Sequence, residues 1–309
     1  MNLPALHTDF ILNRLSPPTG KVRMVLDTDT YNEIDDQFAI VHALTSPERL
    51  QVEAIYAAPF YNSNSDSPGD GMEKSYQEIG KILSLLGLSP EGYAFKGSNR
   101  YLPDATTPVP SEAVSDLIER ALASSDDDPL YVVAIGAITN VASAILLEPS
   151  IRNKIVVVWL GGHALHWPNC DEFNLRQDVH AARVVFDSGV PLVLIPCHGV
   201  ASHLLTTLSE TEKFLRHQGP VGDYLVETFE HCRKDHFAYS RVIWDMSAVA
   251  WLLEPNWVPT SLVHSPIITN SDMCRWSFDS KRHFIRCANS VNRDRIFGDL
   301  YRKVQALNK

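Results

Sequence analysis

The residues best suited to chemistry lie in one short acidic run, DTDTYNEIDD, at residues 27–36. Five of them are carboxylates: Asp27, Asp29, Glu33, Asp35 and Asp36. Acids at the start of a helix are stabilised by its dipole and cap free N–H groups, which accounts for about two or three of them. Five at this density repel one another unless a cation neutralises them. The run therefore predicts a cation site.

The ligand atoms of this run favour a hard cation. Its side chains offer oxygen, which Ca²⁺ and Mg²⁺ prefer, and no His or Cys that would favour zinc. Adjacent residues on a helix point about 100° apart, because one turn takes about 3.6 residues. Asp35 and Asp36 therefore cannot share one role. We expect one to hold the metal and the other to face a bound ligand.

The segments around the acidic run predict an α/β fold. Residues 21–26 are typical of a strand, and residues 34–44 have the apolar spacing of a helix. Apolar runs at 130–135, 155–160 and 191–196 are typical of parallel strands buried on both faces. In such sheets ligands bind at the carboxyl ends of strands, where the acidic run lies.

The remaining pattern completes a mostly parallel central sheet with helices on both faces, in a single domain of residues 1–309. The other expected elements are a strand at 52–57, helices at 72–86, 111–123, 139–147 and 179–186, a hairpin within 267–285 and an amphipathic C-terminal helix containing residues 297–304.

Composition limits the classes of function. The 309 residues are 45% hydrophobic and 21% charged, as in ordinary globular proteins. A net charge of −10 disfavours nucleic acid as a partner. No apolar run reaches the roughly 18–20 residues of a membrane span, and the first 20 residues lack a signal-peptide pattern. Five scattered cysteines without a CxxC pair predict reduced thiols. We expect a cytoplasmic protein with a small-molecule substrate and no membrane partner.

The acidic run by itself leaves a phosphatase open. Phosphatases of the haloacid dehalogenase type carry D-x-D-x-[TV] after their first strand and use Mg²⁺, and residues 27–31 resemble the start of that pattern. Tyr31 stands where the pattern has Thr or Val. Glu33, Asp35 and Asp36 have no role in it.

A resemblance to nucleoside hydrolases extends along most of the chain. Residues 27–39 resemble that family's D-x-D-P-G-x-D-D-x-x-A pattern. Further segments are similar to family motifs and follow in the same order: AIGAITNVA (134–142), LGG (160–162), DEFN (171–174), VP (190–191) and VIWDMSAVAWLLEP (242–255). The chain thus resembles the inosine-uridine preferring nucleoside hydrolases. This implies a Rossmann-like core, hydrolysis of ribonucleosides to ribose and free base, and a homodimer or homotetramer.

The resemblance also implies a calcium site. Asp29, Asp36 and Asp245 would bind Ca²⁺ by their side chains, and Ile135 would bind it by its backbone carbonyl. Asp29 would also be the base that takes the proton of the attacking water. Carboxylates suit this reaction, because its transition state resembles a positively charged ribosyl oxocarbenium ion.

Further residues would bind the ribose. By resemblance, Asp35 would bind the 2′-hydroxyl, Glu172 and Asn174 would bind hydroxyls on the 5′ and 3′ sides, and Asn62 would also contact the sugar. An acidic loop with a helix cap is the alternative for Glu172 and Asn174. We expect Asn140 to be structural, as a cap of the helix that begins near it.

The sequence departs from the family pattern in three places. Residues 30–34 replace a three-residue P-G-x segment. Cys197 and His198 replace a Leu-Asp pair after the strand at 191–196. Trp244 stands where many members have the His that protonates the leaving base; an indole is no general acid, but it can stack on a base or belong to the core.

The sequence therefore does not identify the residue that protonates the leaving base. Candidate acids in segments that can border the base pocket are His163, His166, His236 and Tyr239. Without a proton donor, we expect pyrimidine nucleosides or an unusual N-riboside to be preferred over purines. The alternative function is a ribose- or glycoside-binding protein of the same fold that does not turn its ligand over.

Overall fold

A computed structural model describes residues 4–269 and 274–307, and it contains an eight-stranded sheet in the order β3-β2-β1-β4-β5-β6-β12-β9. Its neighbouring strands are parallel except β9, which is antiparallel to β12. The strands are β1 (Val22–Thr28), β2 (Leu50–Ala57), β3 (Ala94–Lys96), β4 (Leu130–Ala134), β5 (Ile155–Leu160), β6 (Leu192–Ile195), β9 (Thr260–His264) and β12 (Phe284–Ala288).

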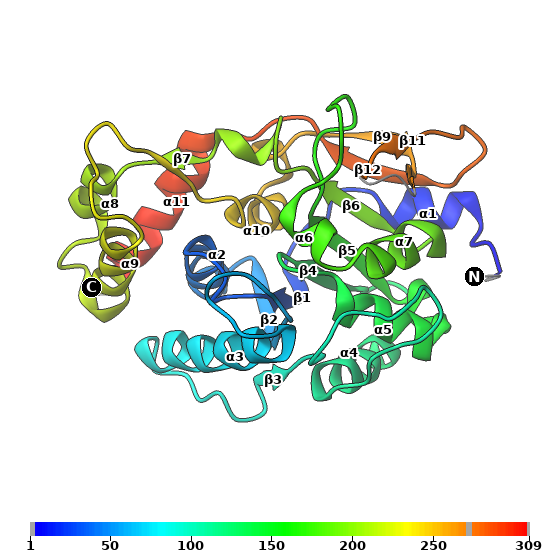
Figure 1. Ribbon diagram of the computed structural model, residues 1–309, viewed down its shortest axis with the longest axis horizontal. Coiled ribbons are helices and arrows are strands. Elements are labelled where there is room, and N and C mark those ends of the chain that lie inside the picture. The colour runs from blue at the N-terminus through cyan, green and yellow to red at the C-terminus, as the bar shows by residue number, and fades with distance from the viewer. Residues whose placement is uncertain (1–3, 270–273, 308–309) are drawn as a thin grey trace.

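Helices cover both faces of this sheet (Figure 1). They are α1 (Thr8–Arg14), α2 (Asp35–Leu44), α3 (Pro68–Leu85), α4 (Glu112–Ala123), α5 (Thr139–Leu147), α6 (Phe173–Gln177), α7 (Val179–Ser188), α8 (Leu208–Leu215), α9 (Gly219–His231), α10 (Met246–Leu253) and α11 (Arg293–Ala306). Shorter elements are the 3₁₀ turns Pro149–Asn153, Ala201–His203 and Pro255–Trp257, and the strands β7 (Leu205–Thr206), β8 (Arg241–Val242), β10 (Ile267–Ile268) and β11 (Trp276–Ser277).

The alternation of side chains along the buried strands creates two hydrophobic cores. On β4, Tyr131 and Val133 face the core that contains α2, α3, α10 and α11. Leu130, Val132 and Ala134 face the other core, which contains α4, α5 and α7. Strands buried on both faces carry continuous apolar runs, which explains why these strands were visible in the sequence.

The predicted α/β fold with a mostly parallel sheet is confirmed. Helix α3 begins at Pro68, earlier than the expected residue 72, because the Ser67 hydroxyl caps it and Pro suits a first turn. The expected hairpin appears as β10 paired with β11, and its residues 270–273 lie outside the described residues. The longer antiparallel pair, β9 with β12, was not predicted.

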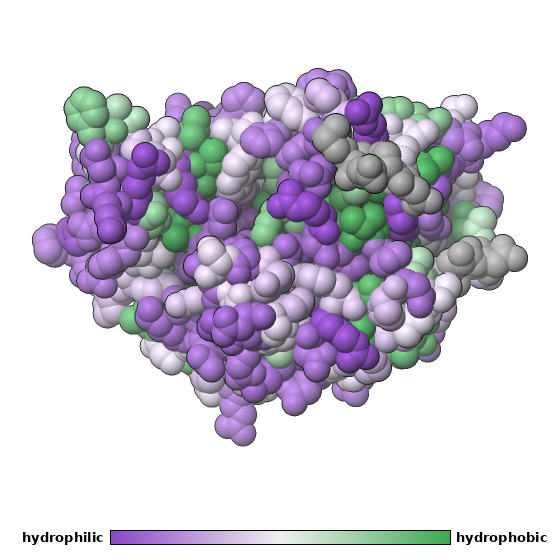
Figure 2. All heavy atoms as spheres, in the orientation of Figure 1, coloured by the Kyte–Doolittle hydropathy of each residue, from purple (hydrophilic) through white to green (hydrophobic). Residues whose placement is uncertain are grey.

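The strand order places a crevice next to the acidic run. The order reverses between β1 and β4, so the connections leave to opposite sides there, which is where ligands bind in open α/β sheets. Figure 2 shows a mostly hydrophilic face with smaller apolar areas between polar side chains. Among the described residues, the structure has no helix long and apolar enough to cross a membrane.

Candidate active site

A cavity of about 220 Å³ lies at the carboxyl ends of the central strands. Segments that follow β1, β4, β5 and β6, together with the start of α10, supply its walls. The lining residues are Asp29, Asn32, Glu33, Asp35, Asp36, Ile135, Leu160, His163, Asp171, Glu172, Phe173, Asn174, Cys197, His198, Trp244 and Asp245. The residues expected to bind the metal therefore lie in one cavity, with most of those expected to bind ribose.

Three buried carboxylates meet in this cavity. Oxygen atoms of Asp35, Asp36 and Asp245 lie within 4.8 Å of one another. Burial, followed by the charges of Asp35 and Asp36, raises the pKa of Asp245 well above its usual range. Burial also raises the pKa of Asp36 to about 6. Ionised carboxylates this close are unfavourable without a cation, so the cluster fits a metal with oxygen ligands.

Asp29 extends the carboxylate cluster from the end of β1. Its Oδ2 is buried and finds no hydrogen-bond partner among the described residues. Burial and the nearby charges of Asp36 and Asp35 raise the pKa of Asp29 well above its usual range. A buried carboxylate oxygen without a donor is costly unless a ligand, a cation or a proton satisfies it. The donor set of this cavity therefore fits a cation on two independent observations.

The adjacent residues Asp35 and Asp36 turn to different neighbours. Asp36 Oδ1 accepts a hydrogen bond from Thr28 Oγ1 at 2.5 Å. Asp35 Oδ2 accepts one from the backbone N–H of Trp244 at 3.1 Å. The different partners agree with the roughly 100° between adjacent helical side chains. Each carboxylate is fixed separately, one from β1 and the other from the segment before α10.

Glu172 and Asn174 have distinct positions in the short helix α6. Glu172 caps α6: its Oε1 accepts the N–H of Asn174 at 2.9 Å, and its Oε2 accepts those of Gly162 at 2.8 Å and Leu175 at 3.1 Å. Asn174 is not the cap. Its Nδ2 donates to the carbonyls of Ile135 at 3.0 Å and Leu160 at 3.1 Å. This amide therefore joins the ends of β4 and β5 at the cavity.

The loop at residues 30–34 is bonded to two residues that do not line the cavity, Asn62 and Arg241. The Nδ2 of Asn62 donates to Oδ1 of the lining residue Asn32 at 2.6 Å. Arg241 Nη2 donates to Oε2 of the lining residue Glu33 at 2.8 Å. Asn62 thus holds Asn32 in the loop of residues 30–34 and does not itself line the cavity. A contact between Asn62 and a sugar would require this loop to rearrange.

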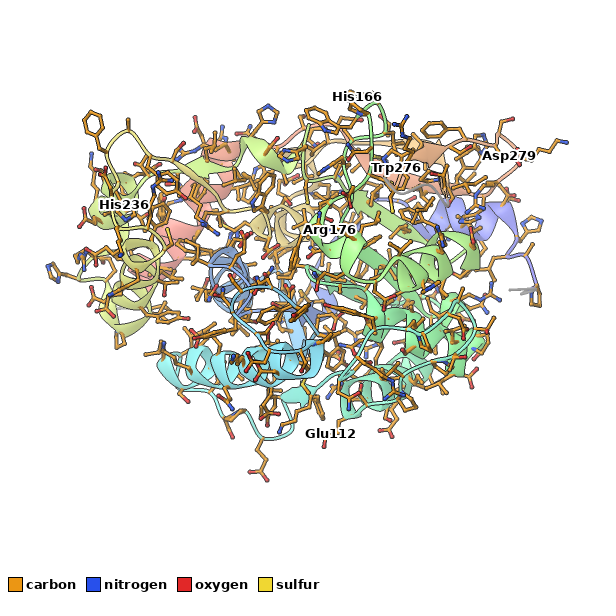
Figure 3. The ribbon with its side chains drawn as sticks, in the orientation of Figure 1. Glu112, His166, Arg176, His236, Trp276 and Asp279 are labelled. Carbon is orange, nitrogen blue, oxygen red and sulfur yellow. The ribbon has the colours of Figure 1, made fainter. Side chains whose placement is uncertain are left out.

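Of the residues expected to protonate the leaving base, some lie inside the cavity and others outside it. His163 lines the cavity, but His236 and Tyr239 are not among the lining residues. His236 packs on Phe229 and its Nε2 lies 3.0 Å from the Glu230 carbonyl. Figure 3 shows His236 at the left of the view, well away from His166 at the top and from Arg176 of α6 near the centre. His166 is also not among the lining residues.

The main lining residue to which the sequence assigned no role is His198. It follows β6, as Asp29 follows β1, so its place after a predicted buried strand is the signal that could have identified it. Asn140, expected as a helix cap, instead donates from Nδ2 to Asp27 Oδ1 at 2.7 Å. This contact joins the first turn of α5 to the end of β1, segments far apart in the chain, so local spacing does not reveal it.

The chain matches known proteins over most of its length. Residues 24–298 match the family model described as inosine-uridine preferring nucleoside hydrolase. A relative from Citrobacter koseri, named pyrimidine-specific ribonucleoside hydrolase RihA, is 29% identical over 249 residues, covering 72% of this chain and 76% of the relative.

Solved structures share the fold. A purine-preferring ribonucleoside hydrolase from Gardnerella vaginalis matches with a TM-score of 0.75 at 23% identity, covering 92% of this chain and 98% of that one. An inosine-uridine preferring nucleoside hydrolase from Bacillus anthracis matches with a TM-score of 0.64 at 16% identity, covering 93% and 99%. The named base preferences of these proteins differ.

Proposed function

Because the chain belongs to the inosine-uridine preferring nucleoside hydrolase family, we propose that it hydrolyses the N-glycosidic bond of ribonucleosides, releasing ribose and a free base. The observation that carries this proposal is the buried carboxylate cluster at the strand ends, inside a cavity. Positive charge develops on the ribose in the transition state. Buried carboxylates stabilise that charge more than they stabilise the neutral nucleoside, which is what lowers the barrier.

The proposed resident cation is Ca²⁺, held by Asp29, Asp36, Asp245 and the carbonyl of Ile135. The close oxygen atoms of Asp36 and Asp245 and the unpartnered Asp29 Oδ2 support this assignment. An oxygen of Asp35 lies within the same 4.8 Å, and Asp35 is assigned to the ribose by its resemblance to the family pattern. The Ile135 carbonyl accepts one hydrogen bond, from Asn174, and a carbonyl oxygen has a second lone pair for a ligand. When bound, a cation of this kind lowers the pKa of a coordinated water and orients it.

The proposed chemistry requires a general base that takes a proton from the water attacking C1′. Asp29 accepts a proton from water while the water oxygen bonds to C1′ and the C1′–N bond breaks. Its Oδ2 suits this task, because no protein donor competes for it among the described residues. Asp35 accepts a hydrogen bond from the ribose 2′-hydroxyl. Asn174 positions the sugar from the junction of β4 and β5.

The test compares Asp29→Asn with Asp127→Asn, a matched change in an exposed loop. With uridine and inosine as substrates, kcat of Asp29→Asn is expected to fall about 10²–10⁴-fold, the usual contribution of a general base. Asp127→Asn is expected to match the wild type. Released base is measured by chromatography and ribose by a reducing-sugar assay.

Three outcomes would contradict the proposal. Nucleoside-dependent stabilisation of the wild type without released base would indicate a binding protein. Undiminished turnover by Asp29→Asn would place the base elsewhere. Mg²⁺-dependent release of phosphate from a phosphomonoester, with no nucleoside turnover, would indicate a phosphatase.

A further inference from the structure

The cavity is lined by a histidine, His198, beside Trp244, and the proposed reaction needs a proton donor for the departing base. Cleavage of the C1′–N bond leaves an electron pair on the base nitrogen, and protonation stabilises the departing base. Trp244 cannot deliver that proton. His198 lies directly against it: the ring centroids are 5.4 Å apart and the rings are nearly perpendicular, at 88°. Both residues line the cavity.

The neighbouring loop holds His198 in place. Its ring stacks on Trp167, with centroids 5.7 Å apart and an interplanar angle of 15°. Its backbone carbonyl accepts the N–H of Ala164 at 3.0 Å. Gly199 adopts a left-handed conformation at φ +90°, and a Cβ there would lie 2.8 Å from the Ala164 Cβ. Only glycine allows the two loops to approach this closely, so the backbone fixes the histidine against the cavity.

His163 is a less suitable donor than His198. Burial and the neighbouring His198 lower the pKa of His163 to about 4, so it is neutral at neutral pH. Its Nδ1 accepts the backbone N–H of His198 at 3.4 Å, which leaves the ring hydrogen on Nε2. His163 is therefore a fixed neutral hydrogen-bonding group. His198, in contrast, is exposed and can recover a proton from solvent.

We propose that His198 is the general acid that protonates the leaving base, replacing the role that Trp244 cannot fill. As the C1′–N bond breaks, its electron pair goes to the base nitrogen, which takes a proton from the His198 ring. The water oxygen bonds to C1′, and its proton goes to Asp29. His198 ends neutral and regains its proton from solvent, so the cycle consumes one water and produces ribose and base.

The ionisable groups around His198 come from three segments. The His163 ring centroid lies 4.6 Å from that of His198, Cys197 precedes His198 in the chain, and Asp245 follows its neighbour Trp244. The loop after β5 also carries His166, which does not line the cavity. The cavity also contains the acids Asp35, Asp171 and Glu172. This proposal rests on the proposed nucleoside hydrolysis, and the experiment keeps the two separable.

The experiment uses two kinds of leaving group. Uridine and inosine need a proton on the departing base, whereas 4-nitrophenyl riboside releases a stabilised anion that does not. His198→Asn removes the acid and the ring, and His198→Phe keeps an aromatic ring for Trp167. The control is His166→Asn, which alters a histidine in the neighbouring loop that is not a lining residue.

We expect both His198 variants to lose about 10²–10⁴-fold in kcat on the nucleosides, the usual contribution of a general acid, with nitrophenyl riboside turnover nearly unchanged. In the wild type, kcat on the nucleosides should fall at basic pH as the acid loses its proton. This fall should be absent from both His198 variants. Equal losses on both kinds of substrate, or undiminished nucleoside turnover, would overturn the proposal. Failure of the wild type on every riboside would instead refute the proposed hydrolysis.

Discussion

At the scale of single residues, the cavity has a carboxylate side and an aromatic side. Asp36 and Asp245 belong to the first, and Trp244 and His198 to the second. The adjacent residues Trp244 and Asp245 join the two sides, because one faces His198 and the other faces Asp36. A ribose bound at the acids would therefore direct its base toward the aromatic side.

Asp36→Asn is expected to weaken Ca²⁺ binding by at least ~100-fold. The change removes one negative charge from the cluster, and losing even an outer partner of a metal site lowers affinity roughly 10–100-fold. Titration calorimetry with Ca²⁺ measures the effect, and Asp127→Asn in the exposed loop is the control. Unchanged affinity in Asp36→Asn would remove this residue from the metal site.

At the scale of elements, the site depends on how strand ends and helix starts are tied together. Glu172 caps α6, and Asp178 caps α7 through the N–H of Ala181 at 2.9 Å. The buried Asp178 also accepts from the N–H of Leu102 at 2.9 Å and from Thr139 Oγ1 at 2.8 Å. One carboxylate thus connects α7, the start of α5 and the segment before α4.

Asp178→Ala is expected to lower the free energy of unfolding by about 2–4 kcal/mol. The substitution removes a helix cap and leaves buried donors without an acceptor. Chemical denaturation measures the change. The control is Asp187→Ala. Asp187 also lies on α7, but its half-exposed carboxylate pairs with Arg282, so the loss should be less than about 1 kcal/mol. Equal losses in the two variants would contradict the role assigned to Asp178.

Gly136→Ala is expected to lower kcat roughly tenfold or more while the protein still folds. A Cβ at Gly136 would lie 3.0 Å from Asp29 Cγ and Oδ1, so the carboxylate must move, and small displacements of a catalytic group are costly. Gly80→Ala on α3 is the control, since a Cβ there meets nothing within 4 Å. Steady-state turnover of uridine checks both variants. Wild-type kcat in Gly136→Ala would show that Asp29 is not constrained there.

The sequence predicted elements well where burial leaves a strong pattern. The strands at 130–135 and 155–160 correspond to β4 and β5, because side chains covered on both faces must be apolar. The half-exposed edge strand β9 lacks that pattern and was missed. In the site, the aspartates at the first strand end were identifiable by type and spacing. The position of His198 against Trp244 depends on packing between two separate strand ends, which spacing does not encode.

At the scale of the whole molecule, buried histidines make stability depend on pH. Burial lowers the pKa of His42, although its Nε2 lies 2.8 Å from Asp299 Oδ2. Burial and the Arg282 charge lower the pKa of His283 to about 4. The unfolded chain takes up these protons near pH 6.5, whereas the folded chain remains neutral. Their contribution to stability is therefore full above about pH 6.5 and is lost as the pH falls toward 4.

The raised pKa values of Asp29, Asp36 and Asp245 act in the opposite direction between pH 7.5 and pH 5, so the contribution of one histidine is measured as a difference between variants. Relative to the wild type, His283→Gln is expected to gain about 1 kcal/mol of unfolding free energy when the pH falls from 7.5 to 5, because one proton-uptake site has been removed. The exposed His166→Gln should behave as the wild type does. Calorimetry across this pH range, without added metal, measures the difference. Parallel pH curves for wild type and His283→Gln would contradict the assignment.

The most direct test is nucleoside turnover by one purified sample before chelation, after EGTA treatment, and after Ca²⁺ is restored. In the proposed mechanism, carboxylates at the strand ends hold a cation and cleave ribosides. This mechanism predicts that ribose and base are released from uridine or inosine, that release stops with EGTA, and that Ca²⁺ restores it. Full turnover after complete removal of the metal would contradict the mechanism, as would a calcium-loaded protein that binds nucleosides and releases no base.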